Sequence, residues 1–407
     1  MTMPPTSVMG AVDVALRLGS AAVLVPSAFL LIEVVASRWG YRAAATPPLD
    51  PTLPAPRISV LVPAHDEAAN IAATVTHLRT QLGAGDRLLV VADNCSDTTA
   101  DLALAAGAEV AVRHDSDRRG KGYALDHGLA VLEREPPDVV LIVDADCRLS
   151  DGSAQLLARA AWQWERPVQA CNLILPHDLA AVGQRVAAFA WRIKNRVRPL
   201  GCAALGIPCL LNGTGMALRW RDLQGVHLAS GNIVEDMQLG LDLARRGNHP
   251  RYCVDALVTS HLAPRAEARA SQRRRWEHGH LATLVRGVPS LIASAIVRRD
   301  APLLGLALEL SVPPLALLLL LVAAMAAVGA AAWLLGLSAW PLGLAGTALA
   351  CIGSAVALAW RSDGRDLLSA RELVQLPSYV LSKLPLYAAM LWRRESRWIR
   401  TDRDEPR

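Results

Sequence analysis

Long apolar segments near both ends of this 407-residue chain constrain its fold more than any other feature. Residues 18–36 are about long enough for one tilted transmembrane helix, and residues 308–337 and 341–360 provide two more. Glu33 interrupts the first segment, at a position expected to be tolerated near a helix end. We therefore predict a protein that crosses a membrane three times, with four spans as the alternative.

Arginines beside the apolar segments indicate how the chain is oriented. Basic residues favour the cytosolic side of a membrane, and the flanking pairs are Arg38 and Arg42, Arg298 and Arg299, and Arg361 and Arg365. The region between the first and second segments is therefore predicted to be cytosolic. Arginine far outnumbers lysine, which occurs only at 121, 194 and 383. This bias is typical of a bacterial protein, so the expected location is the bacterial inner membrane, with a multi-pass topology.

The central region, residues 57–270, alternates strand-like and helical patterns. The apolar runs RISVLVPA, DRLLVVAD, AEVAVRHD and DVVLIVDAD are separated by segments long enough to form helices. Parallel strands need such crossovers, so an α/β fold with a mostly parallel sheet is predicted. Residues 1–56 would supply the first transmembrane helix and an extended Pro-rich linker, TPPLDPTLPAPR.

The remaining boundaries also follow from composition. Residues 271–300 are expected to form interfacial helices, and residues 301–360 the two later spans. Within 361–407, the segment 374–392 carries Lys383 and two prolines and would begin and end on the cytosolic side. We predict an interfacial or re-entrant helix there, followed by a basic cytosolic tail. Seven cysteines form no CxxC pair, so neither a zinc ribbon nor a disulfide framework is expected.

The strongest single motif is DVVLIVDADCRL, a strand that ends in two carboxylates. Side chains alternate along a strand, so Asp144 and Asp146 point the same way. Two converging carboxylates are costly unless a cation neutralises them. Oxygen ligands suit Mg²⁺ or Mn²⁺, which bind through few protein carboxylates together with phosphate oxygens. The sequence therefore predicts a divalent metal site at the carboxyl edge of the sheet.

Polar residues also follow the earlier strands, at the edge where open α/β folds bind ligands. Asp66 is expected to cap the first helix and Glu67 to occupy its first turn, while Asp93 ends the second strand. Lys121 lies between two glycines in DRRGKGYALDHGL, a pattern that suits either a phosphate or ribose site or an ordinary surface loop. The eight-residue Walker pattern is absent, which disfavours phosphoryl transfer from ATP.

Two later motifs complete the candidate site. Glu235 and Asp236 begin an amphipathic helix, where favourable interaction with the helix dipole is a second reading of their position. In SQRRRWEHGH, helical spacing places Gln272, Arg275 and Trp276 on one face. Arg275 offers a planar fork for a diphosphate, and Trp276 a flat apolar surface for a sugar ring or lipid.

The other two arginines in this stretch lie outside that face of the helix. Arg273 and Arg274 are expected to point elsewhere, towards lipid headgroups or solvent. The face formed by residues 272, 275 and 276 would then join the catalytic pocket to the membrane. Such a helix would also help to exclude water from the reaction.

In chain order, the motifs Asp93, Asp144-x-Asp146, Glu235-Asp236 and Gln272-x-x-Arg275-Trp276 form a series. It resembles the D, DxD, TED and Q/RxxRW series of membrane-integrated family 2 glycosyltransferases, which include cellulose, hyaluronan and poly-N-acetylglucosamine synthases. The resemblance covers about residues 57–300, with VED in place of TED and Asp93-Asn94 in place of DG. It implies a GT-A type nucleotide-sugar-binding domain and inverting transfer from a nucleotide-diphosphate sugar, for which we expect a UDP-sugar.

The resemblance also implies roles for the candidate residues. On the donor side, Glu67 and Asp93 would contact the nucleoside with Lys121 nearby, and Asp144 and Asp146 would hold the metal and diphosphate. On the acceptor side, Asp236 with its neighbour Glu235 would supply the general base. Arg275 would stabilise the departing diphosphate. Trp276 would form a platform for the acceptor, and Gln272 would also contact the substrate. Mg²⁺ or Mn²⁺ is the implied cofactor.

Two classes of acceptor are compatible with the sequence. The complete Gln-x-x-Arg-Trp element favours a growing polysaccharide, whereas three spans with two phenylalanines and five tyrosines are a narrow basis for a polysaccharide channel. A lipid or polyprenyl-linked acceptor is therefore the alternative, and an export partner or a homo-oligomer would add helices to a channel. The missing G-x-G-x-x-G disfavours a dinucleotide oxidoreductase. The complete set of carboxylates disfavours an inactive scaffold, and the lack of an aromatic–basic platform disfavours nucleic-acid binding.

Overall fold

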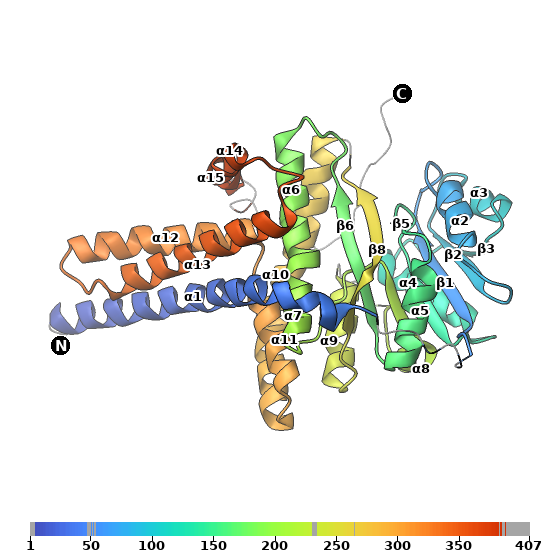
Figure 1. Cartoon of the computed structure of the whole chain (residues 1–407), viewed down its shortest axis with the longest axis horizontal. Helices are drawn as coiled ribbons and strands as arrows, with labels where there is room; N and C mark the ends of the chain where they lie inside the picture. Colours follow the sequence, from blue (N-terminus) through green and yellow to red (C-terminus); the bar gives the residue numbers. More distant parts are fainter. Residues whose placement is uncertain are drawn as a thin grey trace.

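A computed structural model describes residues 5–46, 50, 52, 54–229, 234–263, 265–381, 383–384 and 387. It combines one β-sheet, covered by helices, with a bundle of long helices that projects away from the sheet (Figure 1). The N-terminal end of the described chain lies at the far end of that bundle. The candidate catalytic residues lie between these two parts.

Within the described residues, eight strands form a mixed sheet in the order β3-β2-β1-β4-β7-β6-β8-β5. Neighbours from β3 to β4 are parallel, β7 is antiparallel to both β4 and β6, and β8 is parallel to β6. The four predicted strands and the mostly parallel α/β sheet are therefore confirmed. The strands are β1 (Ile58–Ala64), β2 (Arg87–Asp93), β3 (Glu109–Arg113), β4 (Val139–Ile142), β5 (Arg148–Leu149), β6 (Val168–Leu175), β7 (Met216–Arg219) and β8 (Arg251–His261).

Helices cover both faces of this sheet. Along β1, Val60 and Val62 are buried in one hydrophobic cluster and Leu61 in another, as the alternation of side chains along a strand requires. The apolar run of this strand is therefore explained by burial on two sides. The helices of this domain are α2 (Ile71–Arg79), α3 (Thr99–Ala105), α4 (Lys121–Leu132), α5 (Ser153–Trp164), α6 (Val182–Arg192), α7 (Arg198–Ala204), α8 (Trp220–Leu223) and α9 (Glu235–Arg245).

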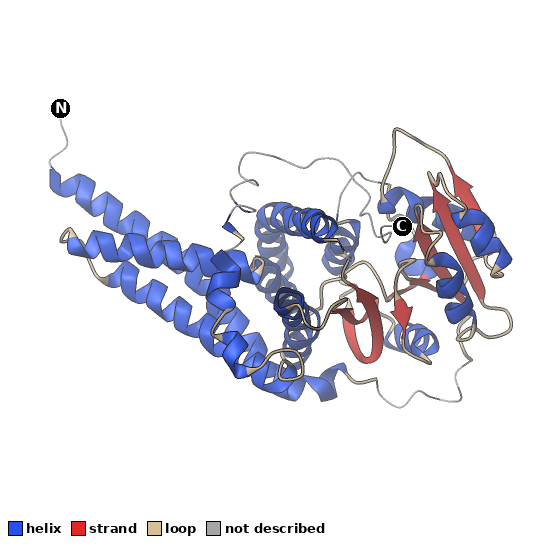
Figure 2. Cartoon of the chain, turned by 90° about the horizontal axis from the view of Figure 1, so that it is seen from above, coloured by secondary structure: helices blue, strands red, loops and turns tan. Residues whose placement is uncertain are grey.

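Within the described residues, four helices are long and apolar enough to cross a membrane: Met9–Ala44, Ala266–Arg298, Leu315–Leu334 and Trp340–Asp363. They belong to α1 (Pro5–Ala44), α10 (Ala266–Arg298), α12 (Leu315–Leu334) and α13 (Trp340–Asp363), and the shorter α11 (Ala301–Ser311) follows α10. Figures 1 and 2 show α1, α12 and α13 side by side, whereas α10 and α11 run across the direction of that bundle. The predicted segment 308–337 is thus divided between α11 and α12 at the proline pair before Leu315.

Exposed aromatic residues lie towards both ends of the bundle. Trp333 and Trp340 flank the turn between α12 and α13, whereas Trp39 and Tyr41 lie where α1 approaches the sheet. Tryptophan and tyrosine are enriched at the two membrane–water interfaces. The apolar helices therefore carry the aromatic pattern expected of membrane-spanning segments.

Glu33 corrects one sequence-based expectation. It lies well inside α1 rather than near a helix end, and it is fully buried. Arg198 of α7 donates to Glu33 through Nε at 2.7 Å and to Glu309 of α11 through Nη2 at 2.5 Å. A buried carboxylate is tolerated where a cation and hydrogen bonds satisfy it. This ion triad, Glu33–Arg198–Glu309, therefore joins the bundle to the catalytic domain.

The C-terminal segment 374–392 is described only in part. Two short helices, α14 (Ala370–Leu373) and α15 (Leu376–Leu381), precede the residues that lie outside the described chain. Arg185 of α6 pairs with Glu372 of α14 at 2.5 Å, which fastens this segment to the catalytic domain. The predicted basic tail lies outside the described residues.

Glycine permits the close approach of α1 and α7. A Cβ atom at Gly201 would lie 2.1 Å from the carbonyl oxygen of Glu33, and one at Gly40 would lie 1.9 Å from that of Leu200. Real Cβ atoms do not approach backbone so closely, so any larger residue must separate the two helices. The ion triad depends on this approach because its members lie on both sides of it.

We predict that Gly201→Ala destabilises the protein by about 1–3 kcal/mol, the usual cost of overpacking. Thermal unfolding of the purified protein in detergent measures this change. Gly346→Ala in α13 is the matched control, because its added Cβ meets nothing within 4 Å. Equal midpoints for the two variants would contradict the close packing of α1 against α7.

Candidate active site

A cavity of about 230 Å³ lies where the carboxyl edge of the sheet meets α10. The end of β4, the N-termini of α4 and α9, and the loop 210–214 supply its polar wall. Of the residues predicted from the sequence, the cavity is lined by Lys121, Asp144, Asp146, Glu235, Asp236, Gln272, Arg275 and Trp276. Glu67 and Asp93 lie outside this lining. Asp144 and Asp236 are 92 residues apart in the sequence, and the fold brings both into this one cavity.

Lys121 lies between the two groups of carboxylates. Its ammonium forms an ion pair with Asp144 and donates to the carbonyl oxygen of Gly213 at 2.6 Å. A Cβ atom at Gly213 would lie 3.0 Å from Asp236 Oδ2 and 3.3 Å from Lys121 Nζ. Gly213 has φ of +90°, and Gly120, which precedes the lysine, has φ of +134°, both favouring glycine. The GKG and GTG motifs therefore shape the backbone around this cation.

Burial and charge shift the acid–base groups of the cavity. Burial, followed by the charge of Asp236, raises the pKa of Glu235 to about 8. Burial also raises the pKa of Asp236, against the opposing effect of Lys121. Although burial disfavours its charge, the surrounding carboxylates Asp144, Glu235 and Asp236 raise the pKa of Lys121. Lys121 therefore stays charged and offsets part of the negative charge.

The carboxylates after β4 fit a divalent metal ion. Asp144, Asp146 and Cys147 offer ligand atoms within 4.8 Å of one another. Burial, followed by the charge of Asp144, raises the pKa of Cys147 to about 12, so its sulfur stays a thiol at neutral pH. A thiol is a poor ligand for a hard cation, whereas two carboxylates suit Mg²⁺ or Mn²⁺. The donor set thus favours oxygen ligation by the two aspartates.

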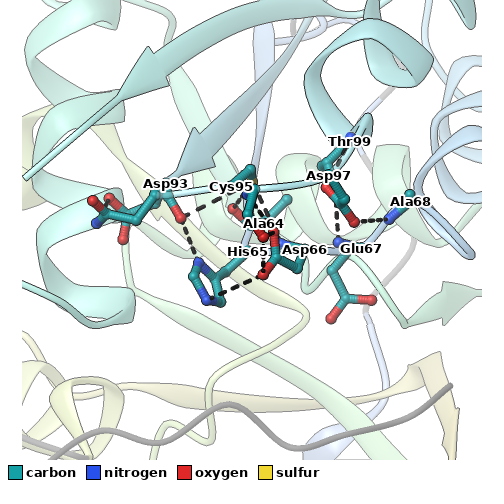
Figure 3. Close-up of polar contacts among 11 residues, drawn as sticks. Ala64, His65, Asp66, Glu67, Ala68, Asp93, Cys95, Asp97 and Thr99 are labelled. Atoms are coloured by element: carbon teal, nitrogen blue, oxygen red, sulfur yellow. Dashed lines mark hydrogen bonds and ion pairs between the residues drawn. The ribbon is translucent and has the colours of Figure 1, made fainter. Parts of the chain in front are cut away.

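The loops that follow β1 and β2 interlock beside this cavity (Figure 3). Asp66 accepts from Ser96 N at 2.6 Å, and Asp97 accepts from Ala68 N at 3.1 Å. The expectation that Asp66 caps a helix is therefore wrong, because α2 begins at Ile71 after Asn70. Asp66 has a positive φ of 51°, which the contact with the neighbouring loop stabilises.

Glu67 and Asp93 occupy this same edge. Glu67 accepts from Asn70 Nδ2 at 3.0 Å and lies before α2, so the prediction that it occupies the first turn of the helix is wrong. Asp93 is buried and accepts from Arg113 Nη1 at 2.6 Å. Its carbonyl oxygen is 2.6 Å from His65 Nδ1. This edge is a firmly held, polar surface next to the catalytic cavity.

The predicted face of α10 is present, with one change. Gln272, Arg275 and Trp276 all line the cavity, as their helical spacing predicts. Arg273 does not point to solvent or lipid alone, because it donates to the hydroxyl of Tyr379 at 3.0 Å and lines a second cavity. The reason is that the segment 370–381 covers this part of the helix.

Trp191 and Lys194 also line the cavity, although no sequence motif indicated them. Trp191 ends α6 and packs against Trp276, with ring centroids 4.8 Å apart and planes tilted by 43°. Lys194 follows in a single π-helical turn (Ile193–Val197), with Nζ 5.3 Å from the centroid of Trp191. Burial lowers the pKa of Lys194, while Asp236 opposes that shift. The rarity of lysine in this arginine-rich chain was the available signal.

Comparison with known proteins agrees with this geometry. Residues 55–279, more than half of the chain, match the family described as "Glycosyltransferase like family 2". Among solved structures, the chain is similar to the mannosyltransferase PcManGT from Pyrobaculum calidifontis, solved with GDP-Man and Mn²⁺. The two share 17% identity with a TM-score of 0.53, covering 93% of this chain and 100% of the other. This likeness shows the GT-A fold.

A weaker match is glucosyl-3-phosphoglycerate synthase from Mycobacterium tuberculosis, solved with Mn²⁺, UDP and phosphoglyceric acid. It shares 22% identity, covers 55% of this chain and 76% of its own, and has a TM-score of 0.35. That score is too low to carry an argument. No curated protein matches this chain.

We predict that stability falls with rising pH because of Glu235. Its folded pKa of about 8 lies above the value of about 4.3 for an unperturbed glutamate. The stabilisation is complete below the unfolded pKa and is lost as pH rises through the folded value, since the unfolded state releases its proton first. Glu235→Gln should therefore raise the unfolding midpoint at pH 8, by about 1 °C for each kcal/mol recovered in a chain of 407 residues.

Thermal unfolding in metal-free detergent at pH 5 and pH 8 checks this prediction. Glu133→Gln, at an exposed position after α4, is the matched control and should leave the pH dependence unchanged. A Glu235→Gln variant that is no more stable than the parent at pH 8 would show that Glu235 is ionised without cost.

Proposed function

Because the chain belongs to the family 2 glycosyltransferases and uses a nucleotide sugar, we propose that it transfers the sugar by a single, inverting displacement with Asp236 as general base. The observation that carries this proposal is the shared cavity of Asp144, Asp146, Asp236 and Arg275. It provides a place for the donor diphosphate and a separate base for the acceptor within one enclosed volume. A UDP-sugar is the first donor to test.

The proposed reaction is a direct displacement at the anomeric carbon of the donor sugar. The acceptor hydroxyl oxygen forms a bond to the anomeric carbon of the sugar, and the bond from that carbon to the diphosphate oxygen breaks. The electron pair stays on the diphosphate, and the hydroxyl proton passes to the carboxylate of Asp236. Met237 N donates to Asp236 Oδ1 at 2.7 Å, which orients the carboxylate and leaves its second oxygen towards Gly213 and the cavity.

Charge in the cavity supports both halves of this step. Lys121 and Lys194 both favour the ionised form of Asp236, which the base needs before the reaction. The guanidinium of Arg275 is placed to stabilise the negative charge that develops on the diphosphate. A divalent cation held by Asp144 and Asp146 would supply further compensation for that charge when bound. The mannosyltransferase of similar fold carries a nucleotide sugar and Mn²⁺, the ligand pair proposed here.

Glu67 and Asp93 are proposed to meet the nucleoside. Both lie at the interlocked loop edge beside the cavity, after β1 and β2. The diphosphate in the cavity would place the nucleoside towards that edge. Asp93 is already paired with Arg113, so it offers a preformed hydrogen-bonding surface rather than a free charge.

The membrane position is also proposed. We infer that α1, α12 and α13 span the bilayer and that α10, which crosses their direction, lies at the interface. Arg38 and Arg42 at the end of α1, and Arg361 and Arg365 at the end of α13, lie where these helices meet the catalytic domain, which supports a cytosolic active site at the bacterial inner membrane. The acceptor is then a polysaccharide or a lipid-linked group.

We expect Asp236→Asn to lower transfer by about 10²–10⁴-fold, the usual contribution of a positioned base. Nucleotide binding should change little, because the donor carboxylates remain. Transfer from a radiolabelled nucleotide-sugar panel and calorimetric binding of UDP or GDP measure the two effects. Asp242→Asn, on the same helix, is the control and should stay active, since Asp242 pairs only with neighbours such as Gln238 and Arg245 at the surface. Near-normal turnover by Asp236→Asn would exclude it as the base.

Removal of divalent metal should abolish transfer, and Mn²⁺ or Mg²⁺ should restore it. Asp146→Asn is expected to weaken Mn²⁺ binding in the presence of nucleoside diphosphate, which electron paramagnetic resonance measures directly. Asp151→Asn, an exposed position five residues later, is the matched control. An enzyme that is fully active in EDTA would remove Asp144 and Asp146 from metal binding.

A further inference from the structure

A second cavity of about 180 Å³ adjoins the catalytic cavity on its membrane side. It lies between α1, α6, α10 and α12, and Tyr379 and Lys383 also line it. The two cavities share Trp191, Lys194, Gln272 and Trp276 in their linings. The shared residues make the second cavity a continuation of the catalytic cavity towards the helical bundle.

We propose that this second cavity binds the acceptor, and that the acceptor is a membrane lipid whose headgroup carries a phosphate and a free hydroxyl. This inference rests on the proposed function, because the hydroxyl must reach Asp236. The lipid tail would leave the cavity towards α1 and α12. The phosphate would meet the cationic side chains at the cavity wall, and the hydroxyl would pass between Trp191 and Gln272 to the base.

The apolar part of the lining supports a lipid tail. Leu30 comes from α1, Leu315 and Ala316 come from the start of α12, and Ile193 comes from the π-helical turn. Leu30 and Leu315 belong to or pack against the same hydrophobic cluster, which extends into the bundle. An apolar wall made by membrane-spanning helices suits an alkyl or isoprenoid chain better than a hydrated polysaccharide.

The charged part of the lining supports an anionic headgroup. Arg198 is already neutralised by Glu33 and Glu309. The other cations in the lining are Lys194, Arg269, Arg273 and Lys383, and Glu277 is the acidic residue among them. Cationic side chains therefore outnumber the acidic one in this lining. A phosphate complements this excess.

Two of these cations converge on one aromatic ring. Arg273 donates to the hydroxyl of Tyr379 at 3.0 Å, and Lys383 Nζ lies 4.5 Å from the centroid of the same ring. Burial, followed by the charge of Arg273, lowers the pKa of Lys383 to about 8. Glu277 offsets part of their mutual repulsion, and an anion between them would relieve more of it. The ring of Tyr379 therefore holds two cations at a position where a phosphate would be favoured.

The junction between the cavities suits a polar headgroup. The tilted rings of Trp191 and Trp276 form one wall, and Lys194 and Gln272 contribute polar atoms beside them. Aromatic rings pack against a sugar or polyol, and the polar groups hydrogen-bond to its hydroxyls. A headgroup that crosses this junction would present a hydroxyl to the cavity that contains Asp236.

Photo-crosslinking of the full-length protein in phosphatidylcholine nanodiscs tests this inference. The probes are phosphatidylglycerol, which has a phosphate and free hydroxyls, and phosphatidylcholine, each with the same diazirine-bearing acyl chain. We expect phosphatidylglycerol to label peptides around Leu30 and Leu315 in preference to phosphatidylcholine. Equal labelling by both probes, or no labelling of these peptides, would overturn the proposal.

Matched variants separate the cavity from the surrounding bilayer. Ala316→Phe fills the cavity and should abolish the preferential labelling, whereas Ala323→Phe, exposed on the same helix, should not. Arg273→Gln should reduce it by about tenfold, the effect of losing about 1.4 kcal/mol of interaction. Arg274→Gln is its control, because Arg274 lines neither cavity. Unchanged labelling in Ala316→Phe and Arg273→Gln would overturn the assignment.

The product distinguishes a lipid from a polymer acceptor. With membranes and radiolabelled nucleotide sugars, the inference predicts label in the chloroform–methanol phase, bound to a phosphate-containing lipid. Label found only in water-insoluble or high-molecular-weight glycan would overturn it. UDP and GDP binding and the loss of transfer in Asp236→Asn report on the proposed function separately. If those hold while lipid labelling fails, the acceptor assignment alone is wrong.

Discussion

The neutralisation of clustered carboxylates is the constraint on which the site depends. Asp144, Asp146, Glu235 and Asp236 line one largely enclosed cavity, where their mutual repulsion is weakly screened. Lys121 meets this repulsion directly, through its ion pair with Asp144 and its position beside Asp236. The donor diphosphate that we propose to bind there would add still more negative charge. The need for cations therefore explains the lysine, the glycines that shape its surroundings, and the divalent metal that we propose.

The ion triad gives the membrane bundle a direct connection to this site. Arg198 joins Glu33 of α1 to Glu309 of α11, and it lines both the catalytic cavity and the second cavity. The glycine contacts between α1 and α7 bring these residues together. Because buried charges are costly when separated, the triad favours one arrangement of bundle and domain. In the proposed mechanism, this arrangement would hold the second cavity in a fixed position relative to Asp236.

Local patterns in the sequence were sufficient to predict much of the fold and site. Period-two and apolar patterns predicted β1 to β4, and the i, i+3, i+4 spacing predicted the cavity-facing side of α10. Tertiary contacts decided the rest. Asp66 bonds across to the loop after β2 instead of capping its own helix, and Glu33 finds Arg198, which is 165 residues away. Trp191 lies in the last turn of α6 and Lys194 in the π-helical turn that follows, which no residue pattern indicated.

The sequence predicts interfacial helices in residues 271–300, most of which lie in α10. Its composition alone permits a membrane span, yet it runs across the bundle, because its polar face covers the catalytic cavity. The central claim is that one base acts opposite one leaving group in that cavity, and the stereochemistry of the product tests it most directly. With an α-linked nucleotide sugar as donor, proton NMR of the product should show a β-linked anomeric centre. An α-linked product would contradict single displacement by Asp236.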